Sequence, residues 1–228
     1  MIVIKNAKVR RLLKILVPAL FIPGVIAAGS YIFRDRNYFA ATLAVAMLSL
    51  VLFIAGFERK KTGTRRLIIV AVMVALSVAG RFIPFFKPVT ALTVITGAYL
   101  GGEAGFLAGS MSAVISNFYF GQGPWTPFQM FAWGLVGLFA GLLGEPLRRS
   151  RALVVLYGAV AGVTYSVVMD VWTVLWYNKG FDPALYLAAL GTALPHTLLY
   201  TASNAVFLWL CARPFGEKLD RVKIKYGV

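Results

Sequence analysis

The sequence has few of the residues that build most reactive sites. Its 228 residues include one histidine, one cysteine (Cys211) and eight carboxylates. One cysteine excludes an internal disulfide, and one histidine excludes a zinc site built from several histidines. The patterns G-x-x-x-x-G-K-[ST] and H-E-x-x-H are both absent, which excludes a P-loop for ATP and a zincin-type metal site.

Acidic residues are scarce within the apolar stretches. Only Asp170 falls clearly inside such a stretch, and most of the other carboxylates lie at the ends of stretches or between them. Proton pumps and intramembrane hydrolases normally need several buried ionisable groups. The sequence therefore disfavours a membrane enzyme, and we expect no catalytic residue, no metal and no resident cofactor.

Charged residues make up only 14% of the chain, whereas 60% of it is apolar. The mean hydropathy is +0.79. A soluble domain averages about 45–50% apolar and about 25% charged residues. Because long apolar runs recur along the whole chain, we predict an all-α, multi-pass protein of the cytoplasmic membrane. The N-terminal stretch lacks a signal-peptide cleavage site, so we expect it to be a retained first span.

Eight membrane spans are expected from the apolar runs. They cover approximately residues 15–33, 38–57, 67–83, 89–101, 104–119, 127–143, 152–176 and a stretch within 183–211. Pro18 and Pro23 predict a kink in the first span. The fourth and fifth are shorter than the roughly 20 residues of a usual span. They form either a tight hairpin through Gly101–Glu103 or a pair in which one segment is re-entrant.

The distribution of basic residues predicts the orientation. With eight spans, 18 of the 23 lysines and arginines fall on one side, within residues 5–14, 59–66, 148–151 and 213–225. Loops rich in lysine and arginine stay in the cytoplasm, so both termini are expected there. The net charge of +15 then reflects topology, and nucleic acid is not an expected partner.

The basic loop at residues 58–66 divides the chain into two expected domains. We predict a transmembrane hairpin over residues 1–64 and a six-span substrate-binding core over residues 65–228. Glycines recur at helical spacing in the core, as in Gly101, Gly105 and Gly109, and this spacing permits close helix crossings.

The outer loops of the core are aromatic and amide-rich, in contrast to the basic inner loops. Part of this pattern is the aromatic belt found at any membrane boundary. Aromatic walls with a few amides are also typical of a pocket for a planar organic ligand. The midspan polar groups Asp170 and His196 are as consistent with structural hydrogen bonding as with ligand contact. The candidate ligand residues are Arg81, Phe85, Lys87, Asn117, Tyr119, Gln122, Trp125, Gln129, Trp133, Asp170, Trp176, Tyr177, Asn178 and His196.

Three alanines, Ala71, Ala75 and Ala79, lie along one face of the third span. Small residues let a second membrane helix approach closely, and van der Waals contact then holds the pair. The second helix belongs either to this chain's own bundle or to a partner protein.

Several motifs together resemble the substrate-binding S component of an energy-coupling factor (ECF) vitamin transporter. They are the alanine face, the run Arg81-Phe-Ile-Pro84, the stretch 93–109 and the stretch 123–129, and the resemblance covers about residues 66–212. It implies capture of a micronutrient at the outer face and contact of the alanine face with a transmembrane coupling protein. It also implies two cytoplasmic ATPase subunits as the energy source. The hairpin over 1–64 departs from the usual six-span pattern.

The resemblance suggests cobalamin as the transported ligand, with pantothenate, riboflavin or a queuosine-type base as alternatives. The bulky, weakly charged outer loops favour a large and mostly uncharged ligand. A stand-alone secondary transporter is a separate hypothesis. It predicts inverted repeats and a coupling-ion site near the bilayer midplane, and the sequence has no convincing internal repeat.

Overall fold

The computed structural model describes residues 4, 6–32, 38–56, 60–84, 86–178 and 180–227, and within these ranges it contains helices and no strand. The helices are α1 (Ala7–Leu16), the π-helical η1 (Val17–Phe21), α2 (Ile22–Ile32), α3 (Tyr38–Ala55), α4 (Lys60–Gly80), α5 (Val89–Leu100), α6 (Gly102–Phe120), α7 (Thr126–Leu142), α8 (Gly144–Arg149), α9 (Arg151–Asn178) and α10 (Pro183–Tyr226).

The predicted all-α, polytopic membrane fold is confirmed. Among the described residues, three helical stretches are long and apolar enough to cross a membrane: Ala7–Gly29, Gly63–Gly80 and Arg151–Asn178. Shorter apolar helices cover Phe39–Ala55, Val89–Leu100 and Thr126–Leu142. The eight expected spans correspond to α1, η1 and α2 taken together, and then to α3, α4, α5, α6, α7, α9 and α10.

The backbone departs from a regular α-helix at a proline and at a glycine that the sequence had pointed to. At Pro18 the helix widens into the π-helical turn η1, where the Ile22 N–H donates to the Val17 carbonyl, because proline removes a regular donor and crowds the preceding turn. At Gly101, φ is +93°, a value that side-chain-bearing residues rarely adopt. This glycine closes a tight hairpin between α5 and α6, which is one of the two arrangements expected.

The last helix extends beyond the expected membrane span. We predicted a stretch ending by Cys211, whereas α10 continues to Tyr226 through Pro195 and Pro214. The added segment is rich in lysine and arginine, so hydropathy does not identify it as part of the helix. Its Gly216 and Leu219 are buried against the bundle, and this tertiary contact lets the helix continue.

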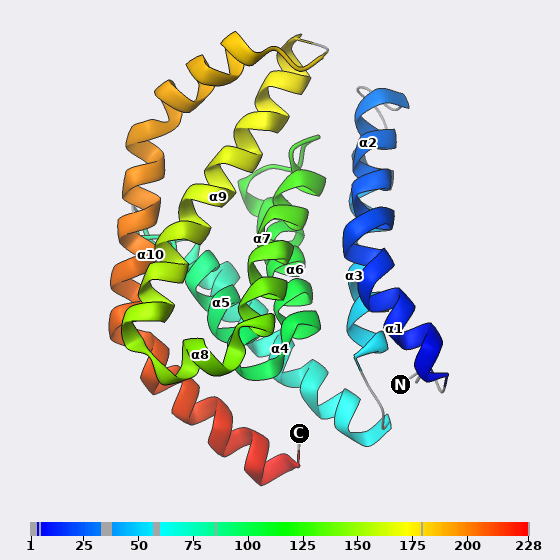
Figure 1. Cartoon of the computed structure of the whole chain (residues 1–228), viewed down its shortest axis with the longest axis vertical. Helices are drawn as coiled ribbons and strands as arrows, with labels where there is room; N and C mark the ends of the chain where they lie inside the picture. The colour runs from blue at the N-terminus through cyan, green and yellow to red at the C-terminus, as the bar shows by residue number, and fades with distance from the viewer. Residues whose placement is uncertain are drawn as a thin grey trace.

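Helices α6 and α7 form the centre of the bundle (Figure 1). A Cβ atom added at Gly105 would lie 2.4 Å from the Gly137 carbonyl oxygen, and one added at Gly109 would lie 2.4 Å from the Trp133 carbonyl oxygen. The backbones can approach this closely only because these positions carry no side chain. The predicted use of glycine for close crossings is therefore confirmed.

The N-terminal helices and the C-terminal helices lie on opposite sides of this centre (Figure 1). Helix α3 packs against α6 and α7, and α9 packs against α10. The Lys14 Nζ atom lies 2.6 Å from the Glu103 Oε1 atom, which connects α1 to the start of α6. The domain division near residue 64 stays a prediction.

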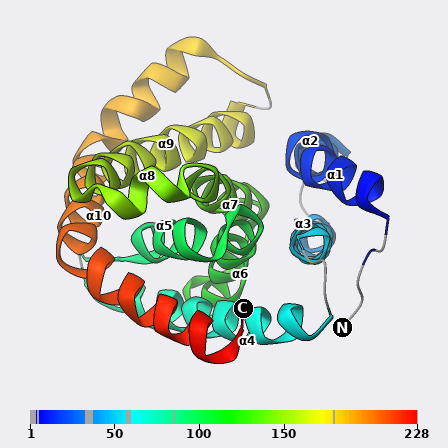
Figure 2. The same cartoon turned by 60° about the horizontal axis from the view of Figure 1, so that its bottom comes forward.

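The segment of α10 after Pro214 runs beside α4 at the end of the bundle where α1 begins (Figure 2). The Arg65 guanidinium donates a hydrogen bond to the Tyr226 carbonyl. This end carries most of the basic residues, so the sequence predicts that it faces the cytoplasm, and we refer to it as the cytoplasmic end.

Candidate functional site

Arg81 organises the outer end of the core. It follows the last residue of α4, and its Nη1 atom donates to Ser116 Oγ at 2.5 Å and to Asn117 Oδ1 at 2.6 Å. Its guanidinium lies 4.8 Å from the centroid of the Phe120 ring and 5.6 Å from that of Trp133. An arginine remains charged at neutral pH. The charge is therefore held between hydrogen-bond acceptors and aromatic faces.

An amide network extends from Asn117 across three helices. Asn117 Nδ2 donates to Thr126 Oγ1 at 3.0 Å and to Gln129 Oε1 at 2.8 Å. Gln129 Nε2 in turn donates to the Tyr165 hydroxyl at 2.8 Å. Gln122 joins through its Oε1 atom, which accepts from Thr126 Oγ1 at 3.0 Å. The network joins α6, α7 and α9, and its buried polar groups satisfy one another.

Four rings form a stacked column beside this network. Trp133 and Tyr165 are stacked with centroids 4.8 Å apart, and Tyr165 and Tyr200 follow at 5.5 Å. His196 stacks on Tyr200 at 5.7 Å. The Trp133 indole N–H donates to Thr90 Oγ1 at 3.1 Å. The column therefore connects α7, α9 and α10, with its histidine end exposed.

A second aromatic group lies at the outer ends of α7 and α9. Trp125 meets Trp172 edge-on with centroids 5.8 Å apart, and Trp172 stacks on Trp176 at 6.2 Å. Tyr177 and Asn178 follow at the end of α9 and are exposed. This group forms a partly exposed aromatic rim.

Asp170 has a buried oxygen atom without a hydrogen-bond partner among the described residues. This atom is Oδ2, and the Asp170 side chain is buried. A buried carboxylate oxygen without a donor is costly, so Asp170 is suited to accept a hydrogen bond from a bound ligand or water.

The alanine face of α4 does not pack inside the bundle. Ala71, Ala75 and Ala79 are all exposed, whereas Val70 and Val74 on the other face are buried. Beside this face, α4 and the end of α10 enclose an apolar groove of about 700 Å³. The alternative of packing within this chain's own bundle is therefore wrong for the described residues.

Comparison with known families agrees with this arrangement. A family model described as the S component of ECF-type riboflavin transporters matches residues 61–220. The chain belongs to this family. It is therefore an ECF S component, a substrate-binding transport subunit for a vitamin-type substrate, and not an enzyme. No curated protein and no solved structure matches it significantly.

S components work with an ECF module of transmembrane and ATPase subunits. The absence of an ATP-binding motif in this S component agrees with that division of labour. The family match also supports its place in a membrane. The stand-alone transporter and the membrane enzyme are thereby set aside.

The structure brings about half of the predicted ligand residues into one region of the S component. Arg81, Asn117, Gln122, Gln129, Trp133 and His196 belong to the network or the column. Lys87 lies 6.0 Å from the Phe120 ring, and Tyr119 is exposed and packs on Phe82. Phe85 lies outside the described residues. The ligand-binding role of all these residues stays a prediction.

The sequence analysis missed Tyr165 and Tyr200, which form the middle of the column. A signal was available, because a tyrosine in the middle of an apolar span needs a partner for its hydroxyl. Thr90 and Ser116 were also missed. They carry no such signal, since hydroxyls in membrane helices commonly bond to their own backbone, as Ser116 also does with Ser112.

Proposed function

We propose that this S component captures a vitamin with a flat heteroaromatic ring at its outer end, with riboflavin as the first candidate. The observation that carries the proposal is the column of Trp133, Tyr165, Tyr200 and His196 beside the amide network. The description of the matching family, which names riboflavin, supports the same choice.

The chemistry of the site suits such a ring. Aromatic faces stack on a planar heterocycle, and amides recognise the carbonyl and N–H groups at its edge. Asn117 and Gln129 can each donate and accept, while Arg81 can only donate. In the present arrangement these groups bond to one another. A ligand would therefore exchange these internal hydrogen bonds for its own, and the polar groups would stay satisfied.

Cobalamin, the leading candidate from the sequence, stays a prediction. The rim formed by Trp125, Trp172 and Trp176 supports it, because a large ligand needs a broad and weakly charged surface. We rank it below riboflavin because the stacked column is suited to a single flat ring. In either case the vitamin is cargo, and we propose no resident cofactor.

For transport, we propose that the alanine face of α4 binds the transmembrane coupling protein in the cytoplasmic membrane, with two cytoplasmic ATPases supplying the energy. The exposure of Ala71, Ala75 and Ala79 beside an apolar groove supports this assignment. Closely packed small residues are the usual means of helix association in lipid.

The binding proposal is tested with the purified full chain in detergent. Riboflavin fluorescence should be quenched on stacking with tryptophan and tyrosine, and titration should give one site per chain. Calorimetry then compares riboflavin with cobalamin, pantothenate and a queuosine-type base. If folded protein bound none of them, the assignment to these vitamins would be wrong.

The coupling proposal is tested separately by Ala75→Leu. Uptake into cells that express the ECF module should be lost, while vitamin binding by the purified chain stays within about twofold. Ala202→Leu is the matched control, since Ala202 is an exposed alanine in the middle of α10. Equal loss of uptake in both variants would contradict a specific coupling face.

A further inference from the structure

The cytoplasmic end of the bundle contains a second recess, separate from the outer site. It has a volume of about 490 Å³ and lies where the ends of α5, α7 and α10 meet the starts of α4 and α8. Three cations, Arg66, Arg148 and Lys223, line it, together with one carboxylate, Glu145.

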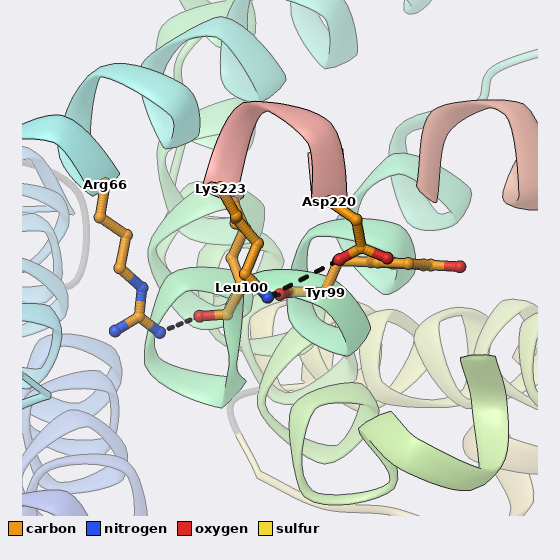
Figure 3. Close-up of polar contacts among 5 residues, drawn as sticks. All are labelled: Arg66, Tyr99, Leu100, Asp220 and Lys223. Atoms are coloured by element: carbon orange, nitrogen blue, oxygen red, sulfur yellow. Dashed lines mark hydrogen bonds and ion pairs between the residues drawn. The ribbon is translucent and has the colours of Figure 1, made fainter. Parts of the chain in front are cut away.

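Two of the cations are fixed by the main chain of α5. Arg66 donates to the Leu100 carbonyl, and Lys223 Nζ donates to the Tyr99 carbonyl at 2.9 Å (Figure 3). The last carbonyls of a helix carry the negative end of its dipole. These contacts hold the two charges in place, and Lys223 Nζ also lies 3.8 Å from Asp220 Oδ1 (Figure 3).

The third cation, Arg148, has no hydrogen bond and no ion pair within the described part of the chain. Its guanidinium lies 5.8 Å from the centroid of the Tyr99 ring. The neighbouring Arg149 holds Glu145 at 2.5 Å, so the carboxylate of the recess already has a partner. Arg148 is thus a positioned donor available to an anion.

Two of the glycines that line the recess hold its walls in close backbone contact. A Cβ atom added at Gly141 would lie 2.1 Å from the Gly102 amide nitrogen, and one added at Gly144 would lie 2.9 Å from the Ala98 carbonyl oxygen. Beside these glycines Leu142 also lines the recess, and 72% of its side-chain surface is exposed. The site therefore combines a cationic interior with an apolar edge.

We propose that this recess binds the anionic oxygens of a phosphate ester, as carried by the headgroup of an anionic phospholipid or by a soluble phosphate ester. Arginine and lysine recognise phosphate through charge-assisted hydrogen bonds. Basic pockets between helices at the cytoplasmic side are suited to lipid headgroups, and exposed Leu142 would lie against an acyl chain. The proposal does not depend on which vitamin is transported.

The test measures lipid retention by native mass spectrometry of the purified full chain, with phosphatidylglycerol and phosphatidylcholine at equal concentration. We expect preferential retention of phosphatidylglycerol. Arg148→Ala should weaken it by about fivefold, the effect of about one basic side chain at a membrane surface. Arg221→Ala is the matched control, because Arg221 is exposed on α10 and does not line the recess. It should change the retention by less than about twofold. Arg148→Glu should abolish the preference.

A second experiment, with a soluble ligand, distinguishes a lipid headgroup from a soluble phosphate ester. Calorimetry with glycerol 3-phosphate should show no binding at millimolar concentration if the lipid is the ligand. If glycerol 3-phosphate bound, and Arg148→Ala abolished this binding but left lipid retention unchanged, the recess would still be a phosphate site. Its ligand would then be a soluble phosphate ester. Equal effects of the Arg148 and Arg221 variants on both lipid retention and glycerol 3-phosphate binding would overturn the proposal, since they would indicate diffuse charge.

Discussion

At the outer end of the bundle a half-buried arginine is held by side chains, whereas at the cytoplasmic end two cations are held by the main chain. Arg81 donates to Ser116 and Asn117. Arg66 and Lys223 donate to carbonyls at the end of α5. Side-chain partners can rotate and exchange for a ligand, but the carbonyls of a helix end cannot. The outer arginine can therefore exchange its hydrogen bonds for those of a ligand, whereas Arg66 and Lys223 hold the helices together and leave Arg148 to meet an anion.

The largest expected effect is that of Trp133→Ala at the outer end. Trp133 is almost fully buried and begins the stacked column, so its loss should lower the free energy of unfolding by about 3–5 kcal/mol. Riboflavin binding should disappear with the stacking surface. Denaturant unfolding in detergent and fluorescence titration measure the two effects. Trp209→Ala, at an exposed tryptophan, should leave both nearly unchanged.

Lys223→Met removes one of the two contacts with the main chain of α5 at the cytoplasmic end. Loss of its charged hydrogen bond to the Tyr99 carbonyl should lower the free energy of unfolding by about 1.5–3 kcal/mol, while vitamin affinity stays within about twofold. The nearby Lys225→Met is the control, since Lys225 is exposed. A large fall in vitamin affinity in the Lys223 variant would contradict the proposal that the vitamin binds at the outer end independently of this contact.

Arg81→Lys sharpens the comparison, because it keeps the charge and removes the planar fork of donors. We expect riboflavin affinity to fall about tenfold, which corresponds to about 1.4 kcal/mol. The same change at the cytoplasmic end, Arg151→Lys, disrupts hydrogen bonds to the Trp209 carbonyl. It should leave affinity unchanged within calorimetric error. Equal losses in the two variants would contradict a binding role specific to Arg81.

The smallest effect is expected for Lys14→Gln, which removes the ion pair with Glu103. Lys14 is 42% exposed, so screening by water limits the loss to about 1 kcal/mol or less. Lys8→Gln is the control on the same helix. If thermal unfolding separated into two transitions only in the Lys14 variant, the ion pair would be a principal link between the hairpin and the core.

The sequence by itself determined the class and the glycine-mediated crossings, and it predicts the orientation. Apolar runs must bury their backbone groups in helices within lipid, and basic loops stay in the cytoplasm. It also determined the alanine face, because residues spaced by four lie on one side of a helix. The motif order was enough to indicate the S-component family.

Only the tertiary structure decided which polar and aromatic residues meet. Trp133, Tyr165 and Tyr200 come from three helices far apart in the sequence, and their stacking depends on how those helices rotate and cross. The tertiary structure also decided that α10 continues past Pro214 and that a recess forms at the cytoplasmic end. Both depend on contacts with α4 and α5, which local hydropathy does not encode.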